Sequence, residues 1–142
     1  MSKYNNKKTR VHGMEFASAW EAERYKQLYL LGKSGYISNL RTQVPYELIP
    51  ARYEMIPTGE LYKVGEKKGQ QKYKRVCVER AVKYIADFVY IEDGKEIVED
   101  TKSPATRSEE GYIIKRKLML HVHNIRLREV LENEDSIRRK RI

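Results

Sequence analysis

Three charged residues, Asp87, Asp100 and Lys102, fall in a segment that otherwise has the composition of a buried β-hairpin. The segment YIADFVYIEDGKEIVEDTK, residues 84–102, is rich in β-branched and aromatic residues, and Asp93-Gly94 forms a turn signal near its centre. Unpaired charge is costly in a strand that is covered on both sides. The three charges therefore point to chemistry rather than to packing.

Two carboxylates and an amine can meet on one face of this hairpin. Residues two apart in a strand share a face, so Asp100 and Lys102 project to one side and Glu99 to the other. Asp87 joins them if it projects to that side near the same end. Two neighbouring carboxylates repel each other unless a bound cation or a proton reduces their negative charge. A hard divalent ion such as Mg²⁺ binds oxygen ligands and can activate a phosphodiester for hydrolysis. The alternative is a surface Asp100–Lys102 ion pair, because the D-x-K pattern alone is loose.

The composition of the chain indicates which binding partner and which cellular compartment to expect. The 142 residues fit one domain, and 29 basic against 20 acidic residues give a net charge of +9 that favours a polyanion, nucleic acid first. The single cysteine, Cys77, permits no intramolecular disulfide and is expected to be a small buried hydrophobe. No apolar run approaches the roughly 20 residues that cross a membrane, so we expect a cytoplasmic protein with no membrane partner. His121 and His123 have an H-x-H spacing, but no third ligand accompanies them.

The elements that must position the charges follow from periodicity. A helix is predicted over about 18–33, with Ser18 as N-cap and Glu21 at the capping-box position. Strands are predicted near 42–49, 76–90, 95–102 and 125–130, with a second helix from about 110 and a loop between Lys102 and that helix. Strict alternation in the second of these strands places Tyr84 and Phe88 on one face and Asp87 on the other.

This order predicts an α/β fold with an αβββαβ core. We expect a flexible basic N-terminus over 1–13, one domain over 14–131 and a basic C-terminal tail over 132–142. Residues 55–75, rich in glycine and lysine, are expected to form an inserted basic loop or protruding hairpin.

The pattern A-D-F followed by (D/E)-x-K on adjacent strands resembles the motif of the PD-(D/E)xK nuclease superfamily, with Ala86 in place of the proline. More closely, residues 14–130 are similar to a family of small phage- and prophage-encoded proteins once catalogued only as a domain of unknown function. The residues that carry this resemblance are Phe16, Ser18, Glu21, Ala22, Arg24, Tyr25, Gln43, Pro45, Leu48, Tyr84, Ala86, Asp87, Phe88, Tyr90, Val98, Glu99, Asp100, Lys102, Tyr112, Lys115, Lys117 and Leu118.

The resemblance implies a single restriction-endonuclease-like domain with a mixed central sheet flanked by helices. It also implies roles for individual residues. Asp87 would be the principal metal ligand, Asp100 the second acidic ligand and Lys102 the catalytic lysine. The backbone carbonyl of Thr101 would complete the coordination of Mg²⁺ or Mn²⁺, and Glu21 would point into the same site unless it serves only the capping box. Glu23 and Glu99 rank below these residues, and Ser103 stands where the family often has glycine.

The function that follows is a metal-dependent DNA endonuclease, encoded by a phage and acting in replication, recombination or DNA processing. By analogy with the superfamily alone, branched DNA is one option for the substrate and a homodimer is one option for the assembly; the sequence leaves the structure of the DNA substrate open. The lysine-rich segments 63–75 and 138–141 would hold the DNA backbone without sequence readout. The alternatives are a non-catalytic nucleic-acid-binding module and a phage structural or assembly protein. The expected nucleic-acid contacts are Lys67, Lys68, Lys72, Lys74, Arg75 and Lys115.

Overall fold

The computed structural model describes residues 8–132, and these fall into two compact units. One unit comprises the chain up to Tyr46 and from Tyr84 onward, and the other is Glu47–Lys83. The insertion expected at 55–75 is therefore a unit of its own with wider bounds. The expected C-terminal tail, apart from Glu132, and residues 1–7 lie outside the described residues.

The first unit is built on a four-stranded sheet with the order β3-β6-β7-β8. β6 and β7 are antiparallel, whereas β7 and β8 are parallel, so the sheet is mixed as expected. Asp93 and Gly94, which join β6 to β7, both have positive φ (50° and 74°), as a tight two-residue hairpin turn requires. The strands are β3 (Ile37–Ile49), β6 (Val82–Glu92), β7 (Lys95–Lys102) and β8 (Arg128–Leu131).

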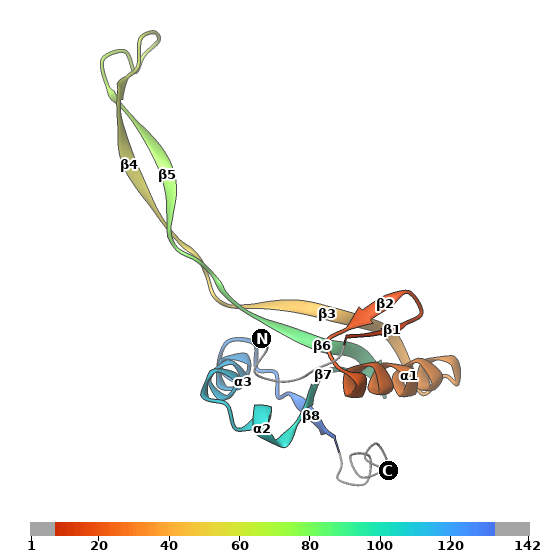
Figure 1. Cartoon of the computed structure of the whole chain (residues 1–142). Coiled ribbons are helices and arrows are strands. Elements are labelled where there is room, and N and C mark those ends of the chain that lie inside the picture. The colour runs from red at the N-terminus through yellow and green to blue at the C-terminus, as the bar shows by residue number, and fades with distance from the viewer. Residues whose placement is uncertain (1–7, 133–142) are drawn as a thin grey trace. The chain divides into compact units, whose positions relative to one another are not determined.

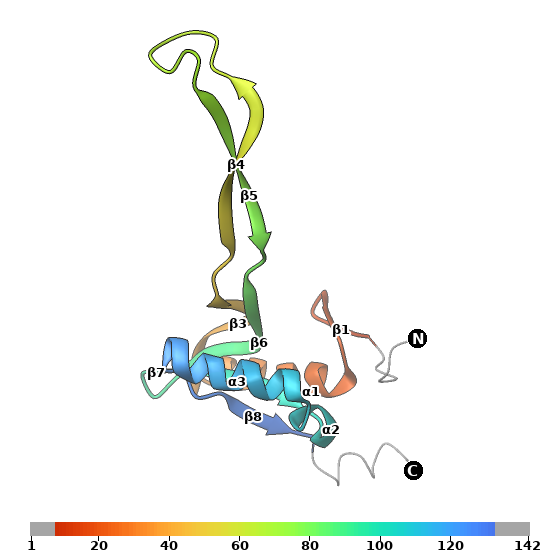
Figure 2. The ribbon, with the colours of Figure 1, turned by 90° about the vertical axis from the view of Figure 1, so that its left-hand side faces the viewer.

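Helices cover both faces of this sheet. Figures 1 and 2 show α1 (Ala19–Lys33) on one face and α3 (Glu110–His123) on the other. On the α1 side, a buried core joins the helix to β6 through Tyr25, Leu28, Phe88 and Tyr90. The mixed α/β architecture with flanking helices agrees with the sequence-based expectation.

The segment between β7 and α3 contains a short helix, α2 (Pro104–Arg107), where a loop was expected. Its start is stabilised by a capping box in which Ser103 and Thr106 each bond the other's backbone N–H, and Pro104 occupies the first turn. Ser103, the residue that departs from the glycine of the related family, therefore has a local structural role.

The start of the chain is more regular than predicted. β1 (Thr9–Val11), which falls in the segment expected to be flexible over 1–13, forms an antiparallel hairpin with β2 (Met14–Phe16). The turn residues His12 and Gly13 both have positive φ. Phe16 is buried against Tyr25 and Phe88, and this burial fixes the hairpin onto the core.

The second unit is a two-stranded antiparallel ribbon, β4 (Arg52–Leu61) and β5 (Gln71–Glu79), which Figure 1 shows as one twisted hairpin. Of the loop and the hairpin that the sequence left open for this insertion, the structure has the hairpin. The prediction of one continuous strand over 76–90 is wrong, because the chain leaves strand geometry at Arg80 and Ala81 between β5 and β6. Cys77 lies on β5 and is exposed, which corrects its expected burial.

Two strand boundaries also differ from the prediction. β3 begins at Ile37, earlier than the expected start near 42, and contains Asn39 and Gln43 with positive φ values of 53° and 52°. Such irregular positions hide the alternation on which the sequence-based boundary depends. β8 is confined to Arg128–Leu131 rather than 125–130.

Candidate functional site

Asp87 is held by Thr101 on the neighbouring strand. Regular pairing between β6 and β7 runs from Glu92↔Lys95 to Phe88↔Glu99. Beyond this point the Asp87 carboxylate accepts two hydrogen bonds at Oδ2, from the Thr101 N–H at 2.9 Å and from Thr101 Oγ1 at 2.7 Å. The Thr101 N–H is thus bonded by the side chain of Asp87 rather than by a backbone carbonyl of β6. These two bonds fix the Asp87 carboxylate at the end of the hairpin.

Asp100 lies on the same side of the sheet and is almost fully buried, with 2% of its surface exposed. Its Oδ2 is 3.0 Å from Lys102 Nζ, which also lies 4.5 Å from the centre of the Tyr112 ring. Burial, followed by the adjacent Asp87 carboxylate, raises the pKa of Asp100 to about 8, and Lys102 partly opposes this shift. Asp100 and Lys102 therefore share a face as the strand periodicity predicted, and Asp87, whose side the sequence had left open, adjoins them.

Glu21 reaches the same group of charges from the first turn of α1. Ser18 Oγ accepts a hydrogen bond from the Glu21 N–H at 3.1 Å, so Ser18 is the N-cap as expected. The buried Glu21 carboxylate accepts a hydrogen bond from Gln43 Nε2 at 3.0 Å. Burial and then the charge of Asp87 raise the pKa of Glu21 to about 7, while Lys102 lowers it. Glu21 is thus both part of the helix start and a neighbour of Asp87.

Two residues of this site were given no role from the sequence. Gln43 is one of the residues that carry the family resemblance, but its contact with Glu21 depends on a left-handed backbone conformation inside β3. Tyr84 was expected on the face of Phe88, opposite Asp87. Burial raises the pKa of the Tyr84 hydroxyl above its ordinary value, and Asp100 is nevertheless near enough for its charge to add to this shift. Regular pairing with β7 ends at Phe88, so Tyr84 lies beyond the part of β6 whose faces that pairing fixes.

Glu99 faces away from Asp100, as predicted. It is fully buried on the α1 side of the sheet, where its two carboxylate oxygens accept hydrogen bonds from Arg24 Nε and Nη2, both at 2.8 Å. The Tyr90 hydroxyl donates a third bond to Glu99 at 2.7 Å. Glu99 is therefore an element of the core rather than of the acidic site.

The basic residues expected to contact nucleic acid fall into two groups. Lys115 is exposed on α3 of the first unit. The second group lies in the β4–β5 unit, where Lys67 and Lys72 place Nζ 5.7 and 5.4 Å from the centre of the Tyr62 ring. This second group consists of Lys67, Lys68, Lys72, Lys74 and Arg75. The basic segment 138–141 lies outside the described residues.

Whether the acidic residues suit a divalent ion can be judged from their donor atoms. Within residues 8–132, no three His, Cys, Asp or Glu side chains are placed to hold a metal ion together, and His121 and His123 are both exposed. Asp87 and Asp100 do adjoin, and their repulsion contributes to the raised pKa of Asp100. Mg²⁺ is often bound through one or two carboxylates and retains several waters. A pair of hard carboxylate donors, with the Thr101 carbonyl beside them in sequence, fits such an ion.

The raised pKa values predict how stability depends on pH without metal. Asp100 and Glu21 keep protons in the folded chain up to pH values of about 8 and 7, whereas carboxyls in an unfolded chain lose them near pH 4. The folded state then binds more protons than the unfolded state between these limits, so the free energy of unfolding should fall as pH rises.

We expect the wild type to lose at least about 1 kcal/mol more than Asp100→Asn between pH 5 and pH 8. Chemical denaturation in a chelator at several pH values measures the difference. Parallel pH profiles for the two proteins would contradict the proposed proton-holding role of Asp100.

Comparisons with known proteins place the chain in a family but give no activity. Within the described residues, no helix is long and apolar enough to cross a membrane. No curated protein and no solved structure matches the chain. The model of one family, described as "Protein of unknown function (DUF1064)", matches residues 1–134. Because this match covers nearly all of the chain, the protein belongs to the DUF1064 family.

Proposed function

We propose that the protein is a metal-dependent endonuclease that hydrolyses phosphodiester bonds in DNA. The observation that supports this function is the meeting of Asp87, Asp100 and Lys102 at the end of the β6–β7 hairpin, with Lys102 Nζ 3.0 Å from Asp100. Two adjacent carboxylates beside a lysine suit the binding of a hard cation and of a phosphate. A mixed sheet flanked by helices is compatible with a restriction-endonuclease-like core of the PD-(D/E)xK type.

Each residue has a distinct part in the proposed reaction. When bound, Mg²⁺ or Mn²⁺ supplies a Lewis acid and lowers the pKa of a coordinated water. Asp87, fixed by Thr101, and Asp100 would hold the ion, with the Thr101 carbonyl as a further donor. Asp100 must give up its proton for this, because its raised pKa favours the neutral acid at neutral pH. Glu21, oriented by Gln43, would be a charged neighbour of Asp87 rather than a third ligand, since no three such side chains of residues 8–132 are placed to hold one ion.

Lys102 is the cation that would act on the substrate. Its ammonium is held between Asp100 and the Tyr112 ring, so it is already positioned before DNA arrives. In the reaction, water adds to phosphorus, one P–O ester bond breaks, and a proton passes to the departing oxygen. The Lys102 ammonium would stabilise the negative charge that develops on the phosphate oxygens.

The biological setting remains the one that the family resemblance implies. We propose a phage-encoded enzyme of the cytoplasm that acts in DNA replication, recombination or processing. The net charge of +9 supports DNA as the partner, because each phosphate contact made by lysine or arginine releases counterions.

A cleavage assay with metal and chelator tests the proposal. We expect the purified chain to cut at least one of supercoiled plasmid, single-stranded oligonucleotide or four-way junction in Mg²⁺ or Mn²⁺. Excess chelator should abolish cutting but leave salt-sensitive binding in place. Binding without cleavage on all three substrates would instead support a non-catalytic nucleic-acid-binding module. Neither binding nor cleavage would support the structural or assembly protein.

A further inference from the structure

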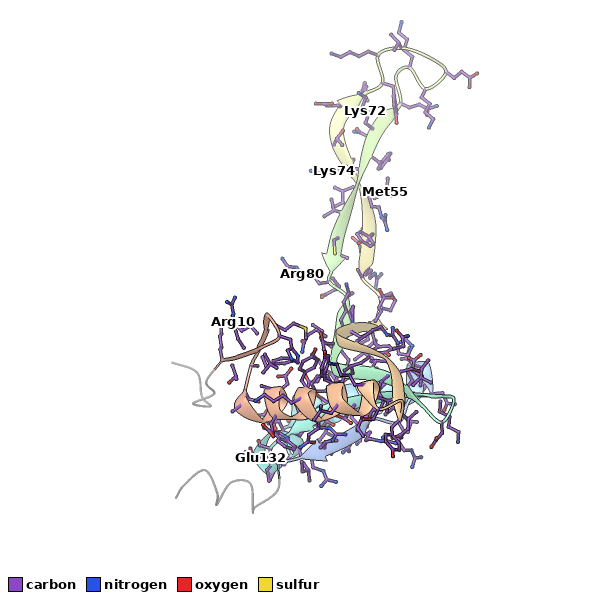
Figure 3. The ribbon with its side chains drawn as sticks, turned by 90° about the vertical axis from the view of Figure 1, so that its right-hand side faces the viewer. Arg10, Met55, Lys72, Lys74, Arg80 and Glu132 are labelled. Carbon is purple, nitrogen blue, oxygen red and sulfur yellow. The ribbon has the colours of Figure 1, made fainter. Side chains whose placement is uncertain are left out.

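The β4–β5 hairpin has two chemically different faces. Directly opposed residues of an antiparallel pair share a face. The pairs Tyr53↔Cys77, Met55↔Arg75 and Pro57↔Tyr73 therefore form one face, while Glu54↔Val76 and Ile56↔Lys74 form the other. We call the first the aromatic face and the second, which alternation extends to Lys72, the lysine face. Figure 3 shows Met55 and Lys74 on opposite sides of the hairpin, in agreement with the register.

The aromatic face is open to a ligand. Its large side chains are about half exposed or more, with values of 46% for Tyr53, 61% for Met55 and 56% for Tyr73. All ten residues of β4 are exposed. An isolated two-stranded hairpin is only marginally stable, so a run of exposed rings along it gains little from internal packing. Exposed apolar surface of this extent is typical of an interaction site.

Charge indicates which partner this hairpin accepts. Residues 47–83 contain nine basic and five acidic residues, and the stretch from Lys63 to Arg75 contains six basic residues and one acidic residue. Lys67 and Lys72 gather around the Tyr62 ring near the tip. This excess is complementary to a polyanion. A second copy of the chain is a poorer match because it carries a net charge of +9 itself.

The side chains of the aromatic face suit stacking better than reading of base edges. The Arg75 guanidinium lies 3.7 Å from the centre of the Tyr53 ring, so that the two flat groups form one platform. Tyr73, Met55 and Pro57 have no forked donor or acceptor with which to read paired bases in a groove. Rings stack on the faces of bases, and these faces are free only where bases are unpaired.

We propose that the aromatic face of the β4–β5 hairpin stacks on unpaired bases while Lys72 and Lys74 contact phosphates. The protein then prefers DNA with single-stranded or unpaired regions to fully paired duplex. This inference rests on the DNA binding in the proposed function and names its substrate class, but it requires no cleavage.

Binding measurements on the full chain in a chelator test the inference. The probes are three fluorescent DNAs of equal length: a single strand, a fully paired duplex, and a duplex with a central unpaired bubble. The wild type should bind the single strand and the bubble at least about 10-fold more tightly than the duplex. Tyr53→Leu with Tyr73→Leu should remove this preference, since stacking contributes about 10-fold per ring. Tyr53→Phe with Tyr73→Phe should keep it, because the ring faces remain.

A matched control is Lys72→Ala with Lys74→Ala on the lysine face. This pair should weaken binding to all three DNAs alike and reduce the salt-dependence slope by about 1.5. Thermal melting of each variant shows whether it folds, and the phenylalanine variant tests stacking even if the leucine variant does not fold.

Three outcomes would overturn the inference. The leucine variant could retain the preference, or lose affinity equally on all DNAs while the fold is intact. Alternatively, sedimentation could show that the leucine variant, and not the wild type, is monomeric, which would make the face a contact between copies. If the protein prefers unpaired DNA but cuts none of the substrates, the stacking inference stands and the proposed endonuclease activity is refuted. Cleavage without preference refutes the inference alone.

Discussion

Asp87→Asn is expected to lower the rate of DNA cleavage by about 10³-fold or more, the scale on which enzymes lose rate when a group acting in the transition state is removed. Asparagine keeps the size of the side chain and an oxygen that can accept from Thr101, which normally donates at 2.9 and 2.7 Å. It loses the negative charge that would hold the cation. Lys102→Met should have a similar effect, because it keeps the length of the stem and loses the ammonium.

The same strand supplies matched controls. Glu96→Gln and Lys95→Met remove an acid and an amine from exposed positions of β7, away from Asp100. We expect both controls to cut DNA at the wild-type rate. Single-turnover cleavage in Mg²⁺, with binding measured separately in a chelator, distinguishes loss of chemistry from loss of affinity. Wild-type cleavage by Asp87→Asn or Lys102→Met would remove the site from the mechanism.

The central hairpin could be predicted because two simple rules act together there. Asp93-Gly94 fixes the turn, and the period of two then places Asp100 with Lys102 and sends Glu99 to the other face. Apolar residues on both faces also indicated a strand covered on each side, and α1 and α3 are the elements that cover the sheet. These features depend on local geometry that the residues themselves specify.

The rest of the site depends on departures from that geometry. Tyr84, whose pKa is raised by burial and by the charge of Asp100, lies beyond the end of regular pairing at Phe88, and nothing in the alternating pattern marks where pairing stops. The approach of Gln43 to Glu21 depends on a positive φ at a residue that is not glycine. The approach of Glu21 itself was available only through the family resemblance, because it lies far from the hairpin in sequence.

The hairpin unit shows a different limit. Cys77 was expected to be buried because cysteine usually is, but burial depends on a second layer that a sequence pattern does not reveal. The β-branched and aromatic residues of β5 predict a strand correctly. Only the structure shows that most residues of this strand are exposed on a two-stranded ribbon rather than in the main sheet.

The largest expected effect on stability comes from Arg24→Met, on the face opposite the acidic site. The Glu99 carboxylate is fully buried and its charge is balanced by two hydrogen bonds from Arg24. Removing one partner of a buried pair leaves an uncompensated charge, at a cost of about 3–5 kcal/mol. The melting temperature should fall by roughly 10 °C or more for a chain of this size.

Comparing the single variant Arg24→Met with the double variant Arg24→Met, Glu99→Met tests whether the unpaired Glu99 charge causes the loss of stability. Because a buried ion pair can be replaced by apolar residues at little cost, the double variant should recover most of the lost stability. Arg41→Met is the exposed control: its 3.9 Å contact with Glu96 is solvent-screened, so the change should stay within about 0.5 kcal/mol. If Arg24→Met is no more damaging than Arg41→Met, the Glu99 network does not hold the strand.

The Arg24 variants also connect stability to the proposed chemistry. Glu99 directly precedes Asp100 on β7, so the bonds that tie Glu99 to Arg24 and Tyr90 on one face fix the direction of Asp100 on the other. A folded Arg24→Met with Glu99→Met protein, assayed below its melting temperature, should therefore cut DNA more slowly than its recovered stability alone predicts. Full cleavage by this double variant would show that packing on the α1 side suffices to orient Asp100 without the buried charges.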